Sequence, residues 1–445
     1  MPEPQHAGDY NITSFMVHSH RFEEPVNIAQ SIDEIEIYEN IELPYLTGTF
    51  SMKDDLNIYD ALGLNGTEMI DIGFESPDNV GHIISKRFTM VEMISSAKAT
   101  ENIEAFEIKI IETNAFNSAM MQINKCYTGT PVQIIRKILK DNLDIDMAEE
   151  DVPDKKPYQE VMKFVVPFMT PFEACEVIRS KMSTDLGLPY FLYSTLNYDT
   201  LQLKSLEDML MTPSINKNMP YRFSQSYNQS TVSAVKEENM INVSAYSSMH
   251  KQNSLALMSS GSTAGQHSIT DMTTGQTVKY NFDIDELFAN MAQVQLIKND
   301  TLPVHHSKYK FKGKMMNEYN TTNVHRAVAN DTYTDINNIH QETNAGAFRL
   351  AACNNALRNM LFKSSMSIRV PGRIYLLGDN ASLGRQIDFI YPSNNSAPTG
   401  TGEVSGDDME DKKRSGVFII YTARHHFNNT QHNVDMSCVK LGNRK

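Results

Sequence analysis

Three histidines and a cysteine lie within fourteen residues near the end of the chain, in the stretch YTARHHFNNTQHNVDMSC. They are His425, His426, His432 and Cys438. Imidazoles and thiolates are the ligands that zinc prefers, and histidine is also the side chain that most often acts as a general base. Residues of these types could form a metal centre or an active site if the elements that carry them bring them together.

The pattern around these residues predicts a β-hairpin. Its strands span 417–427 and 432–441, and NNTQ forms its turn. With Phe427 opposite His432, the same register places Tyr421 opposite Cys438.

Consecutive residues of a strand point to opposite faces of a sheet, so His425 and His426 leave the hairpin on different sides. Cys438 lies six residues beyond His432, which is about 20 Å along an extended strand at ~3.3 Å per residue. Zinc requires all its ligands about 2.0–2.3 Å from one point. We therefore predict that this hairpin closes no metal site and that its histidines are ordinary strand residues.

The motifs of common enzyme classes are absent from the sequence, which has no H-E-x-x-H, no G-x-x-x-x-G-K-[ST] and no G-x-S-x-G. GSTAG at 261–265 has threonine where the nucleophilic serine belongs, and GTGEVSG at 400–406 has the wrong spacing for a dinucleotide loop. The acidic run DDMED at 407–411 lacks the glycine and the spacing of a calcium loop. We predict no catalytic residue, no cofactor and no metal, and hence no enzyme activity.

The composition is typical of a soluble globular protein with several domains: 445 residues, 40% hydrophobic and 21% charged. No apolar run reaches the roughly 18–20 residues that span a bilayer, and no signal peptide is visible, so we expect no membrane anchor. The cysteines form no C-x-x-C pair, which indicates reduced thiols in a cytoplasm. They are Cys126, Cys175, Cys353 and Cys438.

The charge balance argues against specific nucleic-acid recognition. The net charge is −14, and an acidic surface repels phosphate. One basic stretch with interleaved aromatic residues, HHSKYKFKGK at 305–314, could contact nucleic acid. We interpret it instead as a solvated strand and turn.

The first 115 residues predict antiparallel strands with one buried face. Apolar and polar residues alternate in EIEIYENI, TGTFSMK, MIDIGF and EAFEIKI, a pattern typical of a barrel or a sandwich. The side chains expected to face the core are Ile35, Ile37, Ile41, Phe50, Met52, Ile70, Ile72, Phe74, Phe106, Ile108 and Ile110.

The pattern becomes helical over 116–212, which predicts a small α/β domain. Two helices start with a threonine cap, a proline in the first turn and Gln or Glu at the third position. The caps are Thr130 with Pro131 and Gln133, and Thr170 with Pro171 and Glu173. The apolar stripes behind them are Ile134, Ile135, Ile138 and Leu139, and Phe172, Cys175, Ile178 and Met182.

Strand-like sequence resumes after residue 212. We interpret 246–343 as an insertion that contains a flexible loop at 259–268, and 344–362 as a helix. A hydrophilic loop at 393–416 leads into the hairpin.

The strand SMSIRVPGRIYLL, which follows the helix, is interrupted by Pro371 and Gly372. Proline cannot donate a ladder hydrogen bond, so it belongs at a bend or an edge. We expect Gly372 to take a backbone conformation that side chains disfavour.

The order of these C-terminal elements resembles the closing barrel of the phage tail hub superfamily. The residues that carry the resemblance are FRLAACNNALRNMLFKSSMSIRVPGRIYLLGDN, then SGVFIIYTARHHF and a strand that ends in VDMSCVKL. The superfamily includes late control D proteins, T-even-type baseplate hubs and the spike base of VgrG proteins. The segment IELPYLTGTFSMKDD also resembles the first barrel of T-even-type hubs.

The resemblance implies an α+β, mainly β fold with two tube-type antiparallel barrels. The expected domains are a first barrel over 1–115, an α/β domain over 116–212, an insertion over 246–343, and a second barrel over 213–245 plus 344–445. The implied function is that of a baseplate hub, a homotrimer that adapts the sixfold tail tube to the threefold, often lytic, spike. It would line the channel for tape measure and DNA, contact baseplate wedge proteins, and be assembled into the virion tail in the bacterial cytoplasm.

Three other functions are considered from the sequence. A VgrG-like spike base of a secretion or contractile injection system shares the resemblance, but such chains usually continue into further domains. A tail-associated glycoside hydrolase requires a converging carboxylate pair, and nothing in the sequence nominates one. A carbohydrate-binding β protein normally displays exposed aromatic platforms, and this chain has no tryptophan.

Overall fold

The structure is a computed structural model of the chain. It describes residues 8–75, 83–100, 103–148, 162–180, 182–184, 186–216, 219–223, 242–249, 253–272, 275–286, 289, 310–328, 354, 356–359, 365–372, 383–393, 410–411, 414–428 and 431–442. No helix in these ranges is long and apolar enough to cross a membrane.

The N-terminal part is a curved sheet whose apolar face forms its own core. All eleven side chains expected to face a core are buried, as the alternation predicts. Ten of them pack in this core, whereas Ile41 packs in the core of the strands described next. The strands, in sheet order, are β3 (Ile32–Asn40), β4 (Thr47–Asp54), β7 (Glu104–Glu112), β6 (Ile83–Lys98), β5 (Met69–Glu75), β1 (Asn11–His18) and β2 (Val26–Asn27). The short helix α1 (Ile58–Leu62) follows β4. We refer to these strands as the first β unit.

A second group of strands surrounds another core. Its strands are β12 (Tyr221–Phe223), β13 (Asn242–Val243), β14 (Ala245–Met249), β18 (Ser365–Pro371), β19 (Gln386–Ile390), β20 (Gly416–Asn428) and β21 (His432–Gly442). We call them the second β unit. β14 overlaps the start of the expected insertion, yet it pairs with β18 of this unit.

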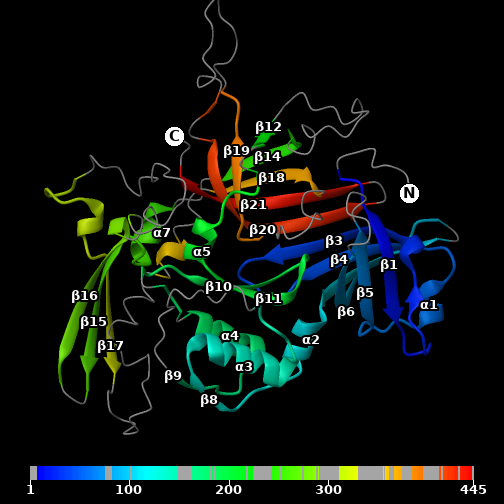
Figure 1. The fold of residues 1–445 in the computed structure, drawn as a ribbon, viewed down its shortest axis with the longest axis horizontal. Coiled ribbons are helices and arrows are strands. Elements are labelled where there is room, and N and C mark those ends of the chain that lie inside the picture. The colour runs from blue at the N-terminus through cyan, green and yellow to red at the C-terminus, as the bar shows by residue number, and fades with distance from the viewer. Residues whose placement is uncertain are drawn as a thin grey trace, which may run out of the picture.

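The two β units are joined in one continuous sheet. One edge of β20 has two partners in succession. Residues 416–419 pair with β19, and residues 422–428 pair with β3. Figure 1 shows the β20–β21 hairpin crossing from the second unit toward the first. Near the tip of this hairpin, Phe427 belongs to the core of the first unit, whereas Ala423 belongs to the core of the second. The fold is thus mainly β, as expected, but its two β units share a hairpin.

The α/β segment packs below this sheet (Figure 1). Both predicted helix caps are confirmed: Thr130 and Gln133 bond reciprocally, as do Thr170 and Glu173. The predicted stripes are buried. Its elements are α2 (Thr113–Ala119), β8 (Cys126–Gly129), α3 (Pro131–Leu143), β9 (Met162–Val165), α4 (Pro171–Ser180), β10 (Tyr190–Thr195), β11 (Tyr198–Ser205) and α5 (Leu206–Met211).

Glu42 joins this segment to the second β unit. It accepts a hydrogen bond from Tyr421 at 2.6 Å, and it forms ion pairs with Arg358 and with Arg179 of α4, the latter at 3.4 Å. The Arg179 side chain is only 1% exposed, and the carboxylates of Glu42 and Glu176 compensate its buried guanidinium.

The insertion forms a small sheet of its own, in which β15 (Ala264–Asp271) lies between β16 (Thr277–Asp283) and β17 (Thr322–Val328). The expected loop at 259–268 is therefore wrong from residue 264 on. Gly265 fits there because an added Cβ would meet the Thr322 hydroxyl at 2.8 Å. Helix α7 (Ser254–Ser259) precedes the sheet, and the 3-10 turn η3 (Met316–Glu318) precedes β17.

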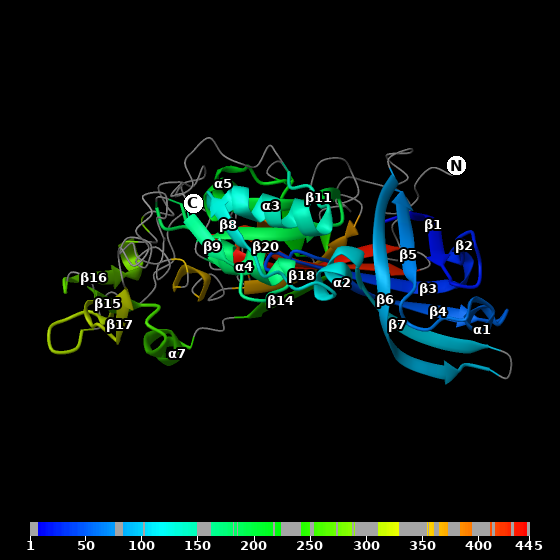
Figure 2. The same cartoon turned by 90° about the horizontal axis from the view of Figure 1, so that it is seen from below.

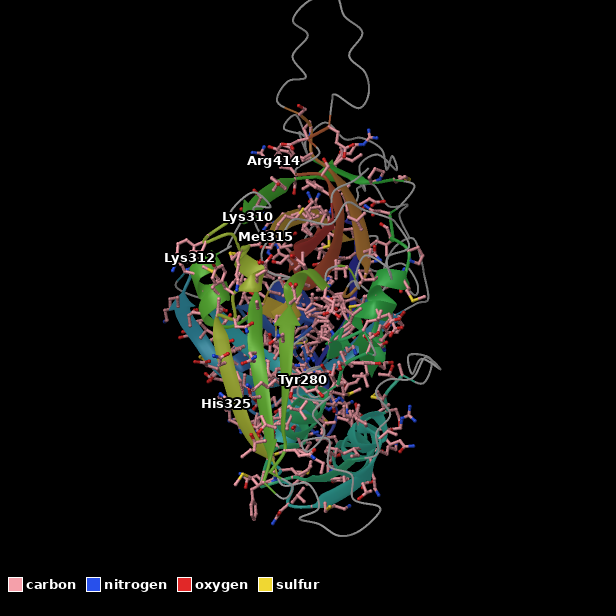
Figure 3. All side chains as sticks on the ribbon, turned by 90° about the vertical axis from the view of Figure 1, so that its left-hand side faces the viewer. Tyr280, Lys310, Lys312, Met315, His325 and Arg414 are labelled. Carbon is pink, nitrogen blue, oxygen red and sulfur yellow. The ribbon has the colours of Figure 1, made fainter. Side chains whose placement is uncertain are left out.

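Figure 3 shows the outer strands of this small sheet with Tyr280 and His325 labelled. Residues 310–314, the described part of the basic stretch, form an exposed turn with Lys310 and Lys312. Of the expected helix at 344–362, residues 354 and 356–359 are helical, and the rest lies outside the described residues. The expected loop at 393–416 lies largely outside them as well.

Candidate functional site: the shared hairpin and the polar face of the sheet

The hairpin that the sequence predicts exists, with strands over 416–428 and 432–442. Phe427 pairs with His432, as expected. The expected pair of Tyr421 and Cys438 is wrong, because the register shifts between residues 420 and 422 and Cys438 faces Ile420. This bulge lies where β20 leaves β19 and joins β3, and an extra residue bends a strand at such a point.

On the inner face of the hairpin, His425 and His432 meet. Nδ1 of His425 lies 3.1 Å from Nε2 of His432, and both side chains are buried. Nε2 of His425 faces the buried Glu39 carboxylate at 3.4 Å. The ring of His432 stacks on Phe427, with centroids 4.1 Å apart. The sequence argument correctly separated His426 and Cys438 from this group but missed that the other two histidines meet.

Burial lowers the pKa of His432 well below its ordinary value, and the neighbouring His425 and His426 lower it further. Protonating this ring inside the protein is therefore unfavourable. His432 is therefore a neutral, hydrogen-bonded member of the core rather than an exposed acid or base.

Gly372 packs directly against this pair. A Cβ built on Gly372 would fall within the His432 imidazole. The expectation of an unusual backbone conformation at Gly372 is wrong, since this glycine is not among those with positive φ. The need for glycine is steric. Pro371 ends β18, where a missing N–H is tolerated.

The outer face of the sheet carries polar side chains across both β units. His426 of β20 lies beside Glu34 and Glu36 of β3, and the three residues offer ligand atoms within 4.8 Å of one another. His426 already bonds Glu34, while Arg424 and Tyr38 donate to Glu36. Burial opposes the effect of these two donors, but they prevail and lower the pKa of Glu36.

These carboxylates therefore have protein partners, and the cluster works as an ion-paired surface. No sequence signal could have found it, because β3 and β20 are almost 400 residues apart and meet only through the sheet.

The same face continues onto β18 and β21, where Arg369 donates two hydrogen bonds to Asp435 at 2.6 and 2.7 Å. An open groove of about 700 Å³ lies here, lined by residues of β3, β14, β18, β20 and β21. Its lining includes Tyr38, Arg424 and Asp435. Such a surface can contact a passing or bound macromolecule, but it lacks the enclosed apolar lining typical of a small-molecule site.

The other candidate residues lie apart from this face. Cys175 and Cys438 are buried, and burial raises the pKa of each thiol, whereas Cys126 is exposed. Residues 261–265 lead into β15, and 400–406 lie outside the described residues, as does most of 407–411.

Comparisons with known proteins match this architecture by structure and not by sequence. No protein-family model matches the chain, and no curated protein matches its sequence. A tail protein from Neisseria meningitidis MC58 superimposes with a TM-score of 0.52 at 11% identity, over 97% of this chain and 96% of that one. The 43 kDa tail protein of prophage MuSo2 from Shewanella oneidensis gives 0.53 at 11% identity, over 96% and 98%.

The chain has the fold of phage tail proteins. This confirms, at the level of the fold, the resemblance that the C-terminal residues carried. A component of the type VI secretion system of E. coli is a weaker match, with a TM-score of 0.40 at 7% identity over 96% of this chain and 78% of that one. Both known tail proteins are covered almost end to end, so the likeness to the tail-protein fold extends over the α/β segment as well as the two β units.

Proposed function

We propose that this chain is the hub of a tail baseplate, a non-enzymatic adapter between the tail tube and the central spike. One observation carries the proposal: a single sheet passes through both β units and presents one polar face. A chain built in this way supplies two tube-like wall segments held rigidly together. Three copies then supply six segments, which is what a joint between a sixfold tube and a threefold spike requires.

The chemistry of the polar face supports a channel wall. Its arginines Arg369 and Arg424 are each paired with a carboxylate, Asp435 and Glu36. A wall whose cations are neutralised in place does not hold phosphate strongly, so DNA and a tape measure protein can pass. The tail-protein fold agrees with this role.

The proposal is tested by the copy number of the chain in purified particles. Quantitative mass spectrometry is expected to find three copies per tail, and loss of the gene is expected to leave particles without assembled tails. Absence of the chain from tails, or six copies per tail, would overturn the proposal. If the chain is instead recovered in secreted spikes and no capsids are present, the spike base of a secretion system would be favoured.

A further inference from the structure

The basic stretch in the insertion contains a tight turn with the sequence KFKGK, residues 310–314, which we call the basic turn. The backbone N–H of Phe311 donates to the carbonyl of Lys314 at 2.9 Å, and the N–H of Lys314 donates to the carbonyl of Phe311 at 3.0 Å. Lys312 and Gly313 have φ of 48° and 79°, and a type I′ turn requires positive φ at both of its central residues. The backbone therefore holds the side chains of the turn in a defined arrangement.

The basic turn exposes three lysines and one phenylalanine. Lys310, Lys312 and Lys314 are exposed, and none of them forms an ion pair with a carboxylate of the described residues. Phe311 is 54% exposed, and an apolar ring gains free energy when it leaves water. Glu318 is the nearest carboxylate along the sequence. The turn thus combines positive charge with apolar surface.

The basic turn lies at one end of the molecule. Figures 1 and 2 show the yellow segment that carries it beside the β15–β17 sheet, at the end away from the first β unit. Figure 3 labels Lys310 and Lys312 on this side. Charges more than about 10 Å apart are largely screened at about 0.1 M salt. Distant parts of this acidic chain therefore act only weakly on a surface that the turn touches.

We propose that the basic turn binds the surface of a lipid bilayer that contains anionic phospholipids. The Phe311 ring enters the boundary between headgroups and acyl chains, where aromatic side chains are favoured. The three lysines bind lipid phosphates, and their alkyl stems lie along the same boundary. Reversible membrane contact becomes stable when an apolar group and a basic patch act together, and this turn supplies both. The contact requires no membrane-spanning segment.

Two other partners fit the turn less well. A nucleic acid would stack a base on Phe311, but Nζ of Lys312 lies over this ring at 5.4 Å from its centroid, and the Tyr319 ring packs against it with centroids 6.1 Å apart. The Tyr319 hydroxyl also donates to the Phe311 carbonyl, which stabilises this arrangement. An acidic protein surface would pair with the lysines but leave Phe311 in water. A bilayer accommodates the charges and the ring together.

A single tryptophan tests insertion of the ring. The chain contains no tryptophan, so Phe311→Trp introduces one fluorophore at the proposed site. With vesicles of equal parts phosphatidylglycerol and phosphatidylcholine, we expect its emission to shift to shorter wavelength and to be quenched by brominated acyl chains. Phe22→Trp is the matched control, because Phe22 lies between β1 and β2 and is 49% exposed; it should show neither change.

Neutral substitutions test the role of the charges. One variant combines Lys310→Gln, Lys312→Asn and Lys314→Gln, with asparagine at the position of positive φ because it tolerates that conformation. Each lysine near an anionic surface strengthens binding about fivefold, so vesicle binding in cosedimentation should weaken about 100-fold. The control variant neutralises three exposed lysines elsewhere, has the same net charge and should bind like the wild type. Its substitutions are Lys98→Gln, Lys137→Gln and Lys279→Gln.

The outcomes decide between the three partners. The proposal is overturned if the wild type binds no anionic vesicles, if the neutralised turn binds them equally well, or if Phe311→Trp binds them without a change in emission. Binding of a polyglutamate peptide or a single-stranded oligonucleotide in place of vesicles would overturn it in favour of an acidic protein or a nucleic acid. If the lysine variant fails to fold, the tryptophan variant decides. The hub proposal does not depend on these results, since the copy number per tail tests it separately.

Discussion

The contact between Gly372 and His432 leads to a sharp prediction for stability. Gly372→Ala adds one methyl group, and the Cβ would fall within the His432 ring. Non-bonded carbon atoms pack at about 3.5–4.0 Å, so the ring or the strand must move by more than about 1 Å. The His432 ring has no free space to move into, because it stacks on Phe427 and lies 3.1 Å from His425.

The expected cost follows from what the movement breaks. Overpacking a filled core costs about 1–3 kcal/mol. Separating the two imidazoles leaves buried polar nitrogens without their bond, which costs about 1–3 kcal/mol more. We therefore expect Gly372→Ala to lower the free energy of unfolding by about 2–5 kcal/mol.

The assay is denaturant unfolding of Gly372→Ala in the wild-type and in a His432→Ala background. With the ring removed, the added methyl group has space, and its cost should fall below about 1 kcal/mol. Gly66→Ala is the matched control: Gly66 has φ of +93° and nothing within 4 Å of an added Cβ, so it should cost only about 1 kcal/mol of backbone strain. Equal costs of Gly372→Ala in both backgrounds would refute the steric argument.

Three further predictions follow from buried and paired groups. The pKa of His432 lies well below 6.5 in the folded chain. As the pH falls below 6.5, this imidazole therefore binds a proton in the unfolded state and not in the folded one. The free energy of unfolding should drop there by up to ~1.4 kcal/mol per pH unit. His432→Gln should reduce this slope in denaturant unfolding at several pH values, and His20→Gln, at an exposed position, should not. Glu42→Ala should lower the free energy of unfolding by about 2–4 kcal/mol, since Arg179 and Arg358 lose their shared carboxylate. The control Glu23→Ala, at an exposed position, should change it by less than about 0.5 kcal/mol. Equal effects of the two substitutions would contradict the stabilising role of the Glu42 ion pairs. Elemental analysis should find zinc at background level in the wild type and in His426→Asn, because the carboxylates of Glu34 and Glu36 already have partners. Stoichiometric zinc in the wild type that is lost in the variant would show a metal site.

Local patterns in the sequence determined the individual elements. The caps at Thr130 and Thr170 and the alternation in β3, β4, β5 and β7 appear in the structure as predicted. These features depend on residues a few positions apart, through helix-cap hydrogen bonds and the alternation of side chains along a strand. The hairpin was predictable for the same reason.

The tertiary structure decided how those elements join and what the histidines do. Residues 264–268 read as loop because small and polar residues lack a periodic signal, yet β15 is a strand since β16 and β17 bond it on both edges. The bulge after Ile420 turns β20 from β19 to β3, and this brings His425 to Glu39 and His426 to Glu34. Pairing between strands far apart in the chain is set by packing and hydrogen bonding in the assembled sheet, and no local sequence window contains that information.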